Sequence, residues 1–307
     1  MQPNKDFITI HDNEKLIKNF LWEVIYSQRA IMHKWSEITN QTPNLKIGYP
    51  GQHLASLITG VKGTGTGARG DDLEDKSEVK SCSRVDQSDK CKKCGSNVLR
   101  SQTECPNCKS KNIKRNNDSK WLIGIRNDIE LDMYLSKIPR MIFIISDYPE
   151  FDEGNFDKIQ FTAYEIWNQS ERATKFREIL KNYYEKIYLP KLNTKDSNKG
   201  SIAPLNFWPY QYNFYMSNPI KTFHATIDFS KNDESAVNID FYVKPDVDRS
   251  TLLSELMPCN LLNKDDKELL GIKDNQKRIY ITEEERNRLS LRETKGLTMK
   301  DKYHRFS

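Results

Sequence analysis

The stretch at positions 70–80 carries the side chains that hydrolysis of a phosphodiester requires. The adjacent carboxylates Asp71 and Asp72 are followed, after a short turn, by a Glu-x-Lys triplet formed by Glu78 and Lys80. Because side chains alternate between the two faces of a strand, Glu78 and Lys80 point to the same side, and the valine between them points into a core. Carboxylates hold Mg²⁺, a hard ion that polarises a phosphate and lowers the pKa of bound water. We therefore predict a catalytic Mg²⁺ site with Asp72 and Glu78 as metal ligands and with Lys80 stabilising or orienting the hydroxide nucleophile.

The first acid of this site has more than one candidate. Asp72 is favoured because apolar Leu73 follows it, as expected at the start of a strand, and Asp71 is the alternative. Glu23 lies on the polar side of a predicted helix and could instead reach the metal, whereas positions 74–75 are expected at the hairpin turn. A solvated charged turn is the competing interpretation in a chain with 30% charged residues. The strand character of the Glu-x-Lys triplet and the glycine-rich loop before it favour a metal-dependent nuclease.

The cysteines predict a second metal site. Four of the six form two Cys-x-x-Cys pairs with ten residues between the pairs, namely Cys91, Cys94, Cys105 and Cys108. Four thiolates at this spacing suit tetrahedral Zn²⁺, with Gly95 and Pro106 supplying the turns. Such a closed site is structural because it leaves no open coordination position. Cys82 and Cys259 stand alone, so the sequence does not indicate a disulfide framework.

Basic residues near both sites are candidates for contact with DNA. The loop at 63–70, which contains Arg69, is either a flexible turn or a glycine-rich loop that lets backbone N–H groups approach a phosphate. Arg84 follows the predicted strand, and Lys92 and Lys93 lie between two of the cysteines. The basic residues of the cysteine module either contact phosphates or form a solvated face.

A stretch at 203–219 is dense in aromatic residues. Core packing is the default interpretation, and the alternative is a surface that stacks on bases or packs against a subunit. Within this stretch, Asn206 and Gln211 could bind adenine through paired hydrogen bonds.

Hydrophobic periodicity and turn signals predict the elements that position these residues. Helices are expected at 13–38, 52–60, 126–138, 169–188 and 283–291. Strands are expected at 77–85, 140–146, 158–167, 222–229, 236–243 and 279–281. The first helix should be capped by Asp12 or Asn13 and should bury an apolar face that includes Ile31 and Met32. The order of elements indicates an α/β (α+β) fold in which helices flank a mixed sheet, with the cysteine module inserted and with loops at 39–51 and 190–202.

Composition fits this interpretation. The 307 residues suffice for one large or two ordinary domains, and the net charge of +5 is compatible with a nucleic-acid partner without requiring one. The start of the chain has no apolar signal region, and the longest strongly apolar run, at 141–145, is too short to span a bilayer. We expect no membrane association and a cytoplasmic location.

The segment 48–57, Gly-Tyr-Pro-Gly-Gln-His-Leu-Ala-Ser-Leu, resembles the MamI family of type II restriction endonucleases, as do Lys80-Ser81-Cys82-Ser83-Arg84 and the four-cysteine module after them. The similarity runs through most of the chain and is densest at about 45–220. The resemblance implies a PD-(D/E)xK nuclease fold in a prokaryotic cytoplasm and Mg²⁺-dependent cleavage of both strands of DNA at a palindromic, in the family an interrupted, site. It also implies 5′-phosphate ends, a homodimer, and a cognate DNA methyltransferase as a genetic rather than physical partner.

Carried over to this chain, the resemblance makes Asp72, Glu78 and Lys80 the first acid, second acid and lysine of the family signature. Asp71 stands where the signature has proline, and five residues separate Asp72 from Glu78, which is shorter than usual. This spacing keeps Asp71, Gln52 and Glu23 as alternatives to the first acid.

These observations predict a nuclease core at 1–89 and 116–190, a zinc ribbon at 90–115, and a DNA-recognition and dimerisation region at 191–307. Two other functions compete with a sequence-specific endonuclease. One is a repair or recombination nuclease that recognises DNA structure, and the other is a zinc-ribbon DNA-binding protein without catalysis.

Overall fold

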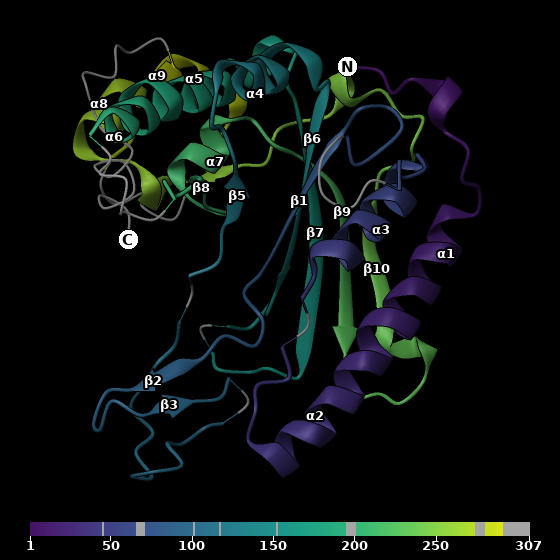
Figure 1. Cartoon of the computed structure of the whole chain (residues 1–307), viewed down its shortest axis with the longest axis vertical. Coiled ribbons are helices and arrows are strands. Elements are labelled where there is room, and N and C mark those ends of the chain that lie inside the picture. The colour runs from purple at the N-terminus through teal and green to yellow at the C-terminus, as the bar shows by residue number, and fades with distance from the viewer. Residues whose placement is uncertain are drawn as a thin grey trace.

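A mixed five-stranded sheet forms the centre of the molecule (Figure 1). The computed structural model describes residues 1–44, 46–65, 71–100, 102–116, 118–151, 153–194, 201–273 and 280–290. The strand order is β1 (Glu78–Ser83), β6 (Arg140–Asp147), β7 (Lys158–Trp167), β9 (Ile220–Asp228) and β10 (Val237–Tyr242). The pair β1–β6 is parallel and the other neighbours are antiparallel. The predicted strands at 77–85, 140–146, 158–167, 222–229 and 236–243 are therefore confirmed.

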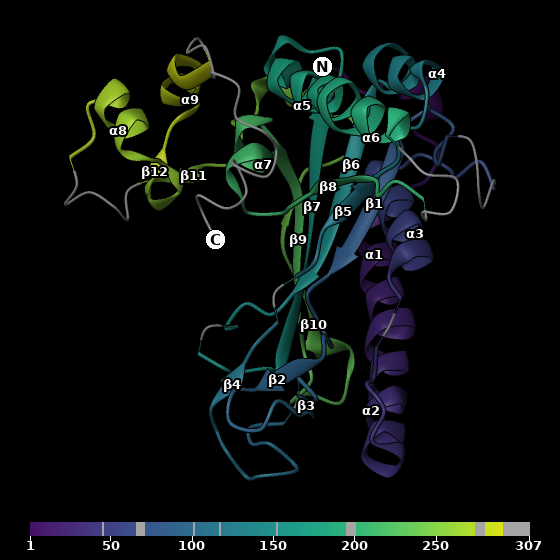
Figure 2. The ribbon, with the colours of Figure 1, turned by 60° about the vertical axis from the view of Figure 1, so that its left-hand side comes forward.

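Helices from the first sixty residues cover one face of this sheet (Figures 1 and 2). A continuous helix consists of α1 (Asn13–Phe20), a π-helical segment η2 (Leu21–Tyr26) and α2 (Ser27–Thr39), and α3 (Gly48–Thr59) lies beside it. The long helix predicted at 13–38 is confirmed. The expected cap is wrong, because Asp12 has a left-handed backbone and its side chain makes no capping hydrogen bond, while the Asn13 amide donates to Leu57 O at 2.7 Å.

The apolar face expected at the end of this helix is not buried. Ile31 is 57% exposed and Met32 is 37% exposed, so their prediction as core residues is wrong. The side of α2 that faces the protein carries Arg29, which donates to the carboxylate of Asp86 and, at 2.9 Å, to the Tyr148 hydroxyl. Because that side is occupied by a buried ion pair, the apolar residues of α2 face outward.

The opposite face of the sheet packs against the middle of the chain. It is covered by α4 (Asp128–Asp132) with η3 (Met133–Lys137), by α5 (Thr174–Tyr183) with η5 (Tyr184–Tyr188), and by α7 (Tyr212–Met216). The helix predicted at 169–188 continues into α6 (Leu189–Asn193), so the loop expected from 190 begins later. A two-stranded ribbon of β5 (Trp121–Ile123) and β8 (Leu205–Phe207) packs against the same core.

Strand β6 is buried on both faces, as predicted. Met141, Phe143 and Ile145 contact the α5 side, whereas Ile142 and Ile144 contact the α3 side. Core packing is likewise the outcome for most of the aromatic stretch at 203–219, whose residues Phe207 and Phe214 are fully buried.

Two smaller sheets complete the fold. The three-stranded sheet β3 (Asn97–Val98), β2 (Asp89–Cys91), β4 (Ile113–Lys114) contains the cysteine module and projects from the end of β1 (Figure 2). It lies at the opposite end of the central sheet from α4, α5 and α6 (Figure 2). Strands β11 (Met257–Pro258) and β12 (Tyr280–Ile281) pair near α8 (Lys264–Leu270) and α9 (Glu283–Ser290). The remaining short helices are η1 (Lys5–Phe7), η4 (Glu171–Ala173), η6 (Glu234–Ala236), η7 (Arg249–Thr251) and η8 (Cys259–Leu261).

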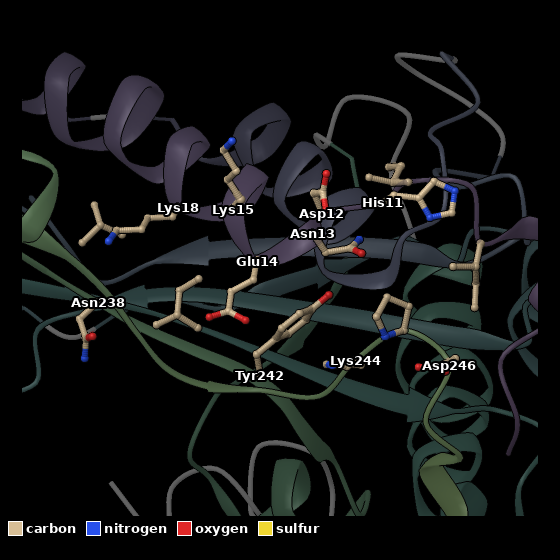
Figure 3. Close-up of a pocket in the computed structure, with 15 residues that line it drawn as sticks. His11, Asp12, Asn13, Glu14, Lys15, Lys18, Asn238, Tyr242, Lys244 and Asp246 are labelled. Atoms are coloured by element: carbon tan, nitrogen blue, oxygen red, sulfur yellow. The ribbon is translucent and has the colours of Figure 1, made fainter.

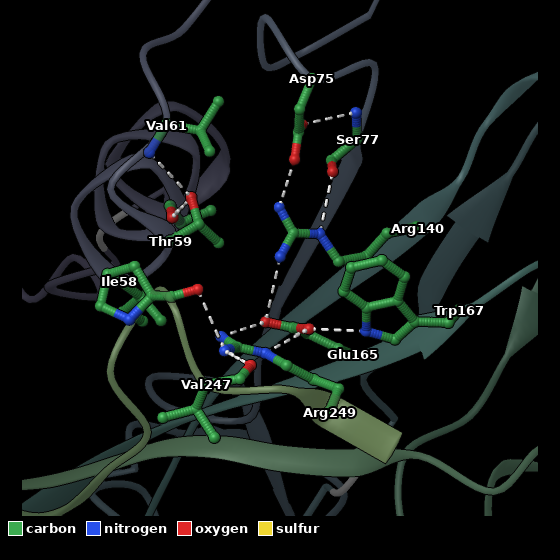
Figure 4. A network of polar contacts seen from close by, with 12 residues as sticks. Ile58, Thr59, Val61, Asp75, Ser77, Arg140, Glu165, Trp167, Val247 and Arg249 are labelled. Carbon is green, nitrogen blue, oxygen red and sulfur yellow. Dashed lines mark hydrogen bonds and ion pairs between the residues drawn. The ribbon is translucent and has the colours of Figure 1, made fainter. Parts of the chain in front are cut away.

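A buried charge network crosses the sheet (Figure 4). The Glu165 carboxylate, which is fully buried, receives hydrogen bonds at 3.3 Å from both Arg140 and Arg249 and a 2.8 Å bond from the Trp167 indole. Burial opposes ionisation of Glu165, but the two arginines outweigh it and hold its pKa below the ordinary value. The network therefore joins β6, β7 and the segment around η7 through one ionised carboxylate.

In the part of the chain that the structure describes, none of the helices is long and apolar enough to span a membrane.

Candidate functional site

The predicted catalytic residues lie at the start of the edge strand β1. Asp72 precedes β1 in a short ladder, in which Leu73 bridges Gly63 and Thr64 N donates to Asp72 O at 3.2 Å. One carboxylate oxygen of Asp72 accepts a 2.7 Å hydrogen bond from Val79 N, and the other accepts a 2.6 Å bond from the Gln52 amide of α3. Asp72 is thus fixed between β1 and α3.

Glu78 and Lys80 share one face of β1, as their alternation predicts. The Lys80 ammonium lies 2.5 Å from a Glu78 carboxylate oxygen, and their side chains are 23% and 12% exposed. Cys82, two residues further on the same face, is buried against the α5 side. The valine between the acid and the lysine packs on the α3 side, which confirms the expectation that it points into a core.

The turn between the two acids is held by the buried network of Figure 4. Arg140 donates to Ser77 Oγ at 2.9 Å and to the Asp75 carboxylate at 2.5 Å, while its remaining nitrogen contacts Glu165. Positions 74–75 form the turn, as predicted. The role of Arg140 had no local sequence signal because its partners are 25 and more than 60 residues away.

Both acids are electrostatically strained without a cation. Burial is the main cause that raises the pKa of Asp72 and of Glu78 above ordinary values, and it outweighs the opposing effect of Lys80. Repulsion between carboxylates adds to both effects, because Asp71 raises the pKa of Asp72, and Asp72 and Asp71 raise the pKa of Glu78. A bound cation would relieve this repulsion.

The donor set fits Mg²⁺. Each carboxylate oxygen of Asp72 accepts one hydrogen bond, which leaves each oxygen with a further lone pair, and Glu78 has one oxygen outside the Lys80 contact. Two carboxylates are a usual protein contribution to a Mg²⁺ site, in which water and substrate phosphate supply the other ligands. Of the alternatives, Gln52 contacts Asp72 directly, and the Glu23 side chain is exposed on η2.

The four cysteines of the module converge on one point. Their sulfur atoms all lie within 4.8 Å of one another, and the pairs Cys91–Cys108 and Cys94–Cys105 are 3.6 and 3.5 Å apart. A tetrahedral Zn²⁺ with bonds of about 2.3 Å places its sulfurs about 3.8 Å apart, so the cluster fits this ion. Among the described residues it is the one group of three or more such ligands with this geometry.

The two turns of the module are alike in hydrogen bonding. Gly95 N donates to Cys91 O and Lys109 N donates to Cys105 O, each at 2.9 Å. Both Gly95 and Lys109 have positive φ, at 76° and 57°. The sequence predicted the first of these turns from its glycine, whereas Lys109 adopts the same conformation without one.

Two basic residues of the module are structural. Asp89, which is fully buried, binds Arg100 at 3.0 Å and Arg115 at 2.8 Å. The Arg100 guanidinium also lies 4.8 Å from the ring centre of Phe151, and the Arg115 guanidinium lies 4.8 Å from that of Phe156. Both rings belong to the segment between β6 and β7. These two arginines therefore attach the module to the core. The other basic residues of the module are exposed, namely Lys90, Lys92, Lys93, Lys109, Lys111 and Lys114.

The remaining predicted DNA contacts are dispersed. Arg84 binds Asp147 at 3.0 Å and lies over the Tyr210 ring, so its guanidinium already has protein partners. Asn206 lies on β8 opposite Leu122, and Gln211 precedes α7. Arg69 falls outside the described residues. Of these candidates, Lys92 and Lys93 project from the module with exposed side chains.

A large pocket lies away from the acids. It has a volume of about 850 Å³ between the start of α1 and strand β10, and both acidic and basic side chains line it (Figure 3). At its floor, Tyr242 donates to Ile58 O at 3.0 Å and Asn13 donates to Leu57 O. Because these bonds tie α1 and β10 to the end of α3, we assign this region to the scaffold.

The fold and the clustered residues define a mixed-sheet α+β protein with two acids and a lysine at a strand edge and a separate four-cysteine cluster. A sequence model of the MamI restriction endonuclease family matches residues 34–260, and the chain belongs to this family. The type II restriction enzyme MamI of Microbacterium ammoniaphilum is 31% identical over 78 residues, which is 25% of each chain. No solved structure matches this chain.

Proposed function

We propose that this protein is a type II restriction endonuclease that hydrolyses both strands of double-stranded DNA at a specific, palindromic site and leaves 5′-phosphate ends. Family membership over residues 34–260 supports the class of activity. The observation that carries the proposal is a pair of contacts at the start of β1: Val79 N donates to Asp72, and the Lys80 ammonium donates to Glu78.

The roles of the three residues follow from their surroundings. Asp72 and Glu78 would hold Mg²⁺, which supplies charge stabilisation at the phosphate and a more acidic bound water. Gln52 and Val79 N fix the orientation of Asp72. Lys80 contacts one oxygen of Glu78, and it would orient a hydroxide or stabilise charge that develops on the phosphate.

The module at 90–115 would be a zinc ribbon that contacts the DNA backbone. Lys92 and Lys93 are exposed there, and neutralisation of phosphates by lysine gives sequence-independent affinity. Residues 1–89 and 116–190 would form the nuclease core, and 191–307 would contribute recognition and dimer contacts. A homodimer would match a two-fold DNA site and would place one set of acids on each strand.

Cleavage of a long unmethylated DNA of known sequence tests the proposal. We expect discrete fragments with Mg²⁺ and none with EDTA. Smearing or preferential cleavage of branched DNA would favour a structure-specific nuclease, and binding without cleavage would favour a DNA-binding protein.

Substitution of the lysine tests the site. Lys80→Ala should lower the cleavage rate by about 10²–10⁴-fold, as expected when a group that acts on the transition state is lost. DNA binding in a gel-shift assay should persist. Lys181→Ala, on an exposed part of α5, is the matched control and should cleave normally. Full activity of Lys80→Ala would rule out the assigned site.

A further inference from the structure

The outward face of α3 is polar and lies beside the acids. Tyr49, Gln52, His53 and Ser56 are spaced i, i+3, i+4 and i+7, so they share one side of this helix. Residues on the other side, including Leu54 and Ile58, pack against the sheet. The helix therefore presents a row of hydrogen-bonding side chains away from the core.

This row lines a pocket that includes Asp72. The pocket has a volume of about 380 Å³, and Gly63, Gly65 and Leu73 also line it. Its volume is within the range of about 300–1,000 Å³ that holds one small molecule or one unit of a larger ligand. Gln52 and Asp72 both line the pocket, and the Gln52 amide donates to Asp72 at 2.6 Å. The proposed metal ligand is therefore part of the pocket wall.

The lining favours an anionic, hydrogen-bonding ligand. Among the described residues that line the pocket, Asp72 is the one carboxylate, and a bound cation would neutralise it. Gly63 and Gly65 have no side chains, and a Cβ at Gly65 would meet nothing within 4 Å, so the backbone there is open to close approach. His53 is exposed and Tyr49 is 63% exposed, so both rings are accessible.

We propose that this pocket binds the nucleotide next to the phosphate that Asp72 and Glu78 act on, with His53 and Tyr49 contacting its sugar and phosphate. The inference rests on the proposed function, because the ligand is a part of the DNA strand. Asp72 lines the pocket and also accepts the hydrogen bond from Val79 N, the residue between Glu78 and Lys80 on β1. A strand that crosses this edge places one phosphate at the acids and the adjoining nucleotide against α3.

Histidine modification tests the proposal within the wild-type protein. Diethylpyrocarbonate reacts with exposed histidine rings, and mass spectrometry reports the rate at each of the five histidines. A saturating DNA duplex in Ca²⁺, which takes oxygen ligands as Mg²⁺ does, should slow modification of His53 at least fivefold. His11, which is also exposed but lines the separate pocket of Figure 3, should react at an unchanged rate.

Kinetics of two variants give an independent readout. His53→Ala should raise the KM for DNA at least tenfold and change kcat less, whereas His11→Ala should leave both unchanged. The proposal is overturned if a gel shift shows bound DNA while His53 reacts at its free rate, or if the two variants have equal kinetics. If wild-type protein neither binds nor cleaves DNA, the proposed function itself fails, which separates the two failures.

Discussion

Replacement of Gly51 by alanine tests how closely α3 must approach β1. A Cβ built at Gly51 lies 1.9 Å from Ser81 Oγ and 2.8 Å from Ser81 Cβ. Carbon atoms that are not bonded sit about 3.5–4.0 Å apart, so the two Cβ atoms are too close by about 0.7–1.2 Å. The serine cannot rotate its Cβ away, and α3 must therefore move outward.

This displacement has two consequences of known size. Overpacking of a core contact costs about 1–3 kcal/mol of unfolding free energy. The same displacement would lengthen the 2.6 Å bond from Gln52 to Asp72 to about 3.3–3.8 Å, which exceeds the usual N–H···O range of about 2.7–3.2 Å. A hydrogen bond to a charged group is worth about 1.5–3 kcal/mol, so we expect about 10–150-fold slower cleavage.

Urea unfolding and plasmid cleavage measure both effects. Gly48→Ala in the first turn of the same helix is the matched control, because a Cβ there meets nothing within 4 Å. Ser81→Gly should restore Gly51→Ala, since it removes both clashing atoms, and the buried Ser81 hydroxyl has no hydrogen-bond partner to lose among the described residues. The reasoning is refuted if Gly51→Ala keeps wild-type stability and rate, or if Ser81→Gly brings no recovery.

Three further changes probe charge and metal. Glu78→Gln should stabilise the metal-free protein at neutral pH, because burial raises the folded-state pKa of Glu78. As pH falls from neutral through that raised pKa, Glu78 becomes protonated in the wild-type protein, which then gains the same stability. The advantage of the variant in urea unfolding should therefore disappear at acid pH, and a difference that stays constant with pH would contradict this prediction. We expect elemental analysis to find one zinc per chain in the wild-type protein and in the control Cys259→Ala, whereas Cys94→Ser should lose the zinc and some stability, since metal binding is coupled to folding. Zinc-free wild-type protein would refute the ribbon. Glu165→Gln should cost about 3–5 kcal/mol because it removes the carboxylate partner of the buried Arg249 and leaves the buried Arg140 with Asp75 alone. A loss below about 1 kcal/mol in urea unfolding would contradict the network.

Local patterns predicted the parts of the structure that depend on neighbouring residues. The spacing of Cys91, Cys94, Cys105 and Cys108 is enough to gather four sulfurs, because each pair closes its own turn. Alternation along β1 likewise placed Glu78 and Lys80 on one face, because strand geometry imposes it.

Contacts between distant segments could not be predicted in this way. Nothing near Arg100 or Arg115 indicates that both turn inward to Asp89, and as basic residues of the module they were candidates for phosphate contact. The apolar residues of α2 have the helical period of a core face, yet the buried side is taken by the Arg29–Asp86 ion pair. Periodicity shows which residues share a side of a helix, and only the tertiary partner decides which side is covered.

The Glu165 network also bears on the order in which the chain assembles. Its members enter in the sequence Asp75, Arg140, Glu165 and Arg249, with separations of 65, 25 and 84 residues between bonded partners. A nascent chain grows from its N-terminus, so the turn that spaces the two acids meets Arg140 and Glu165 well before Arg249 exists. Ribosomal synthesis thus delivers the last charge of the network 84 residues after Glu165, so this buried carboxylate lacks one of its two arginine partners until that stage.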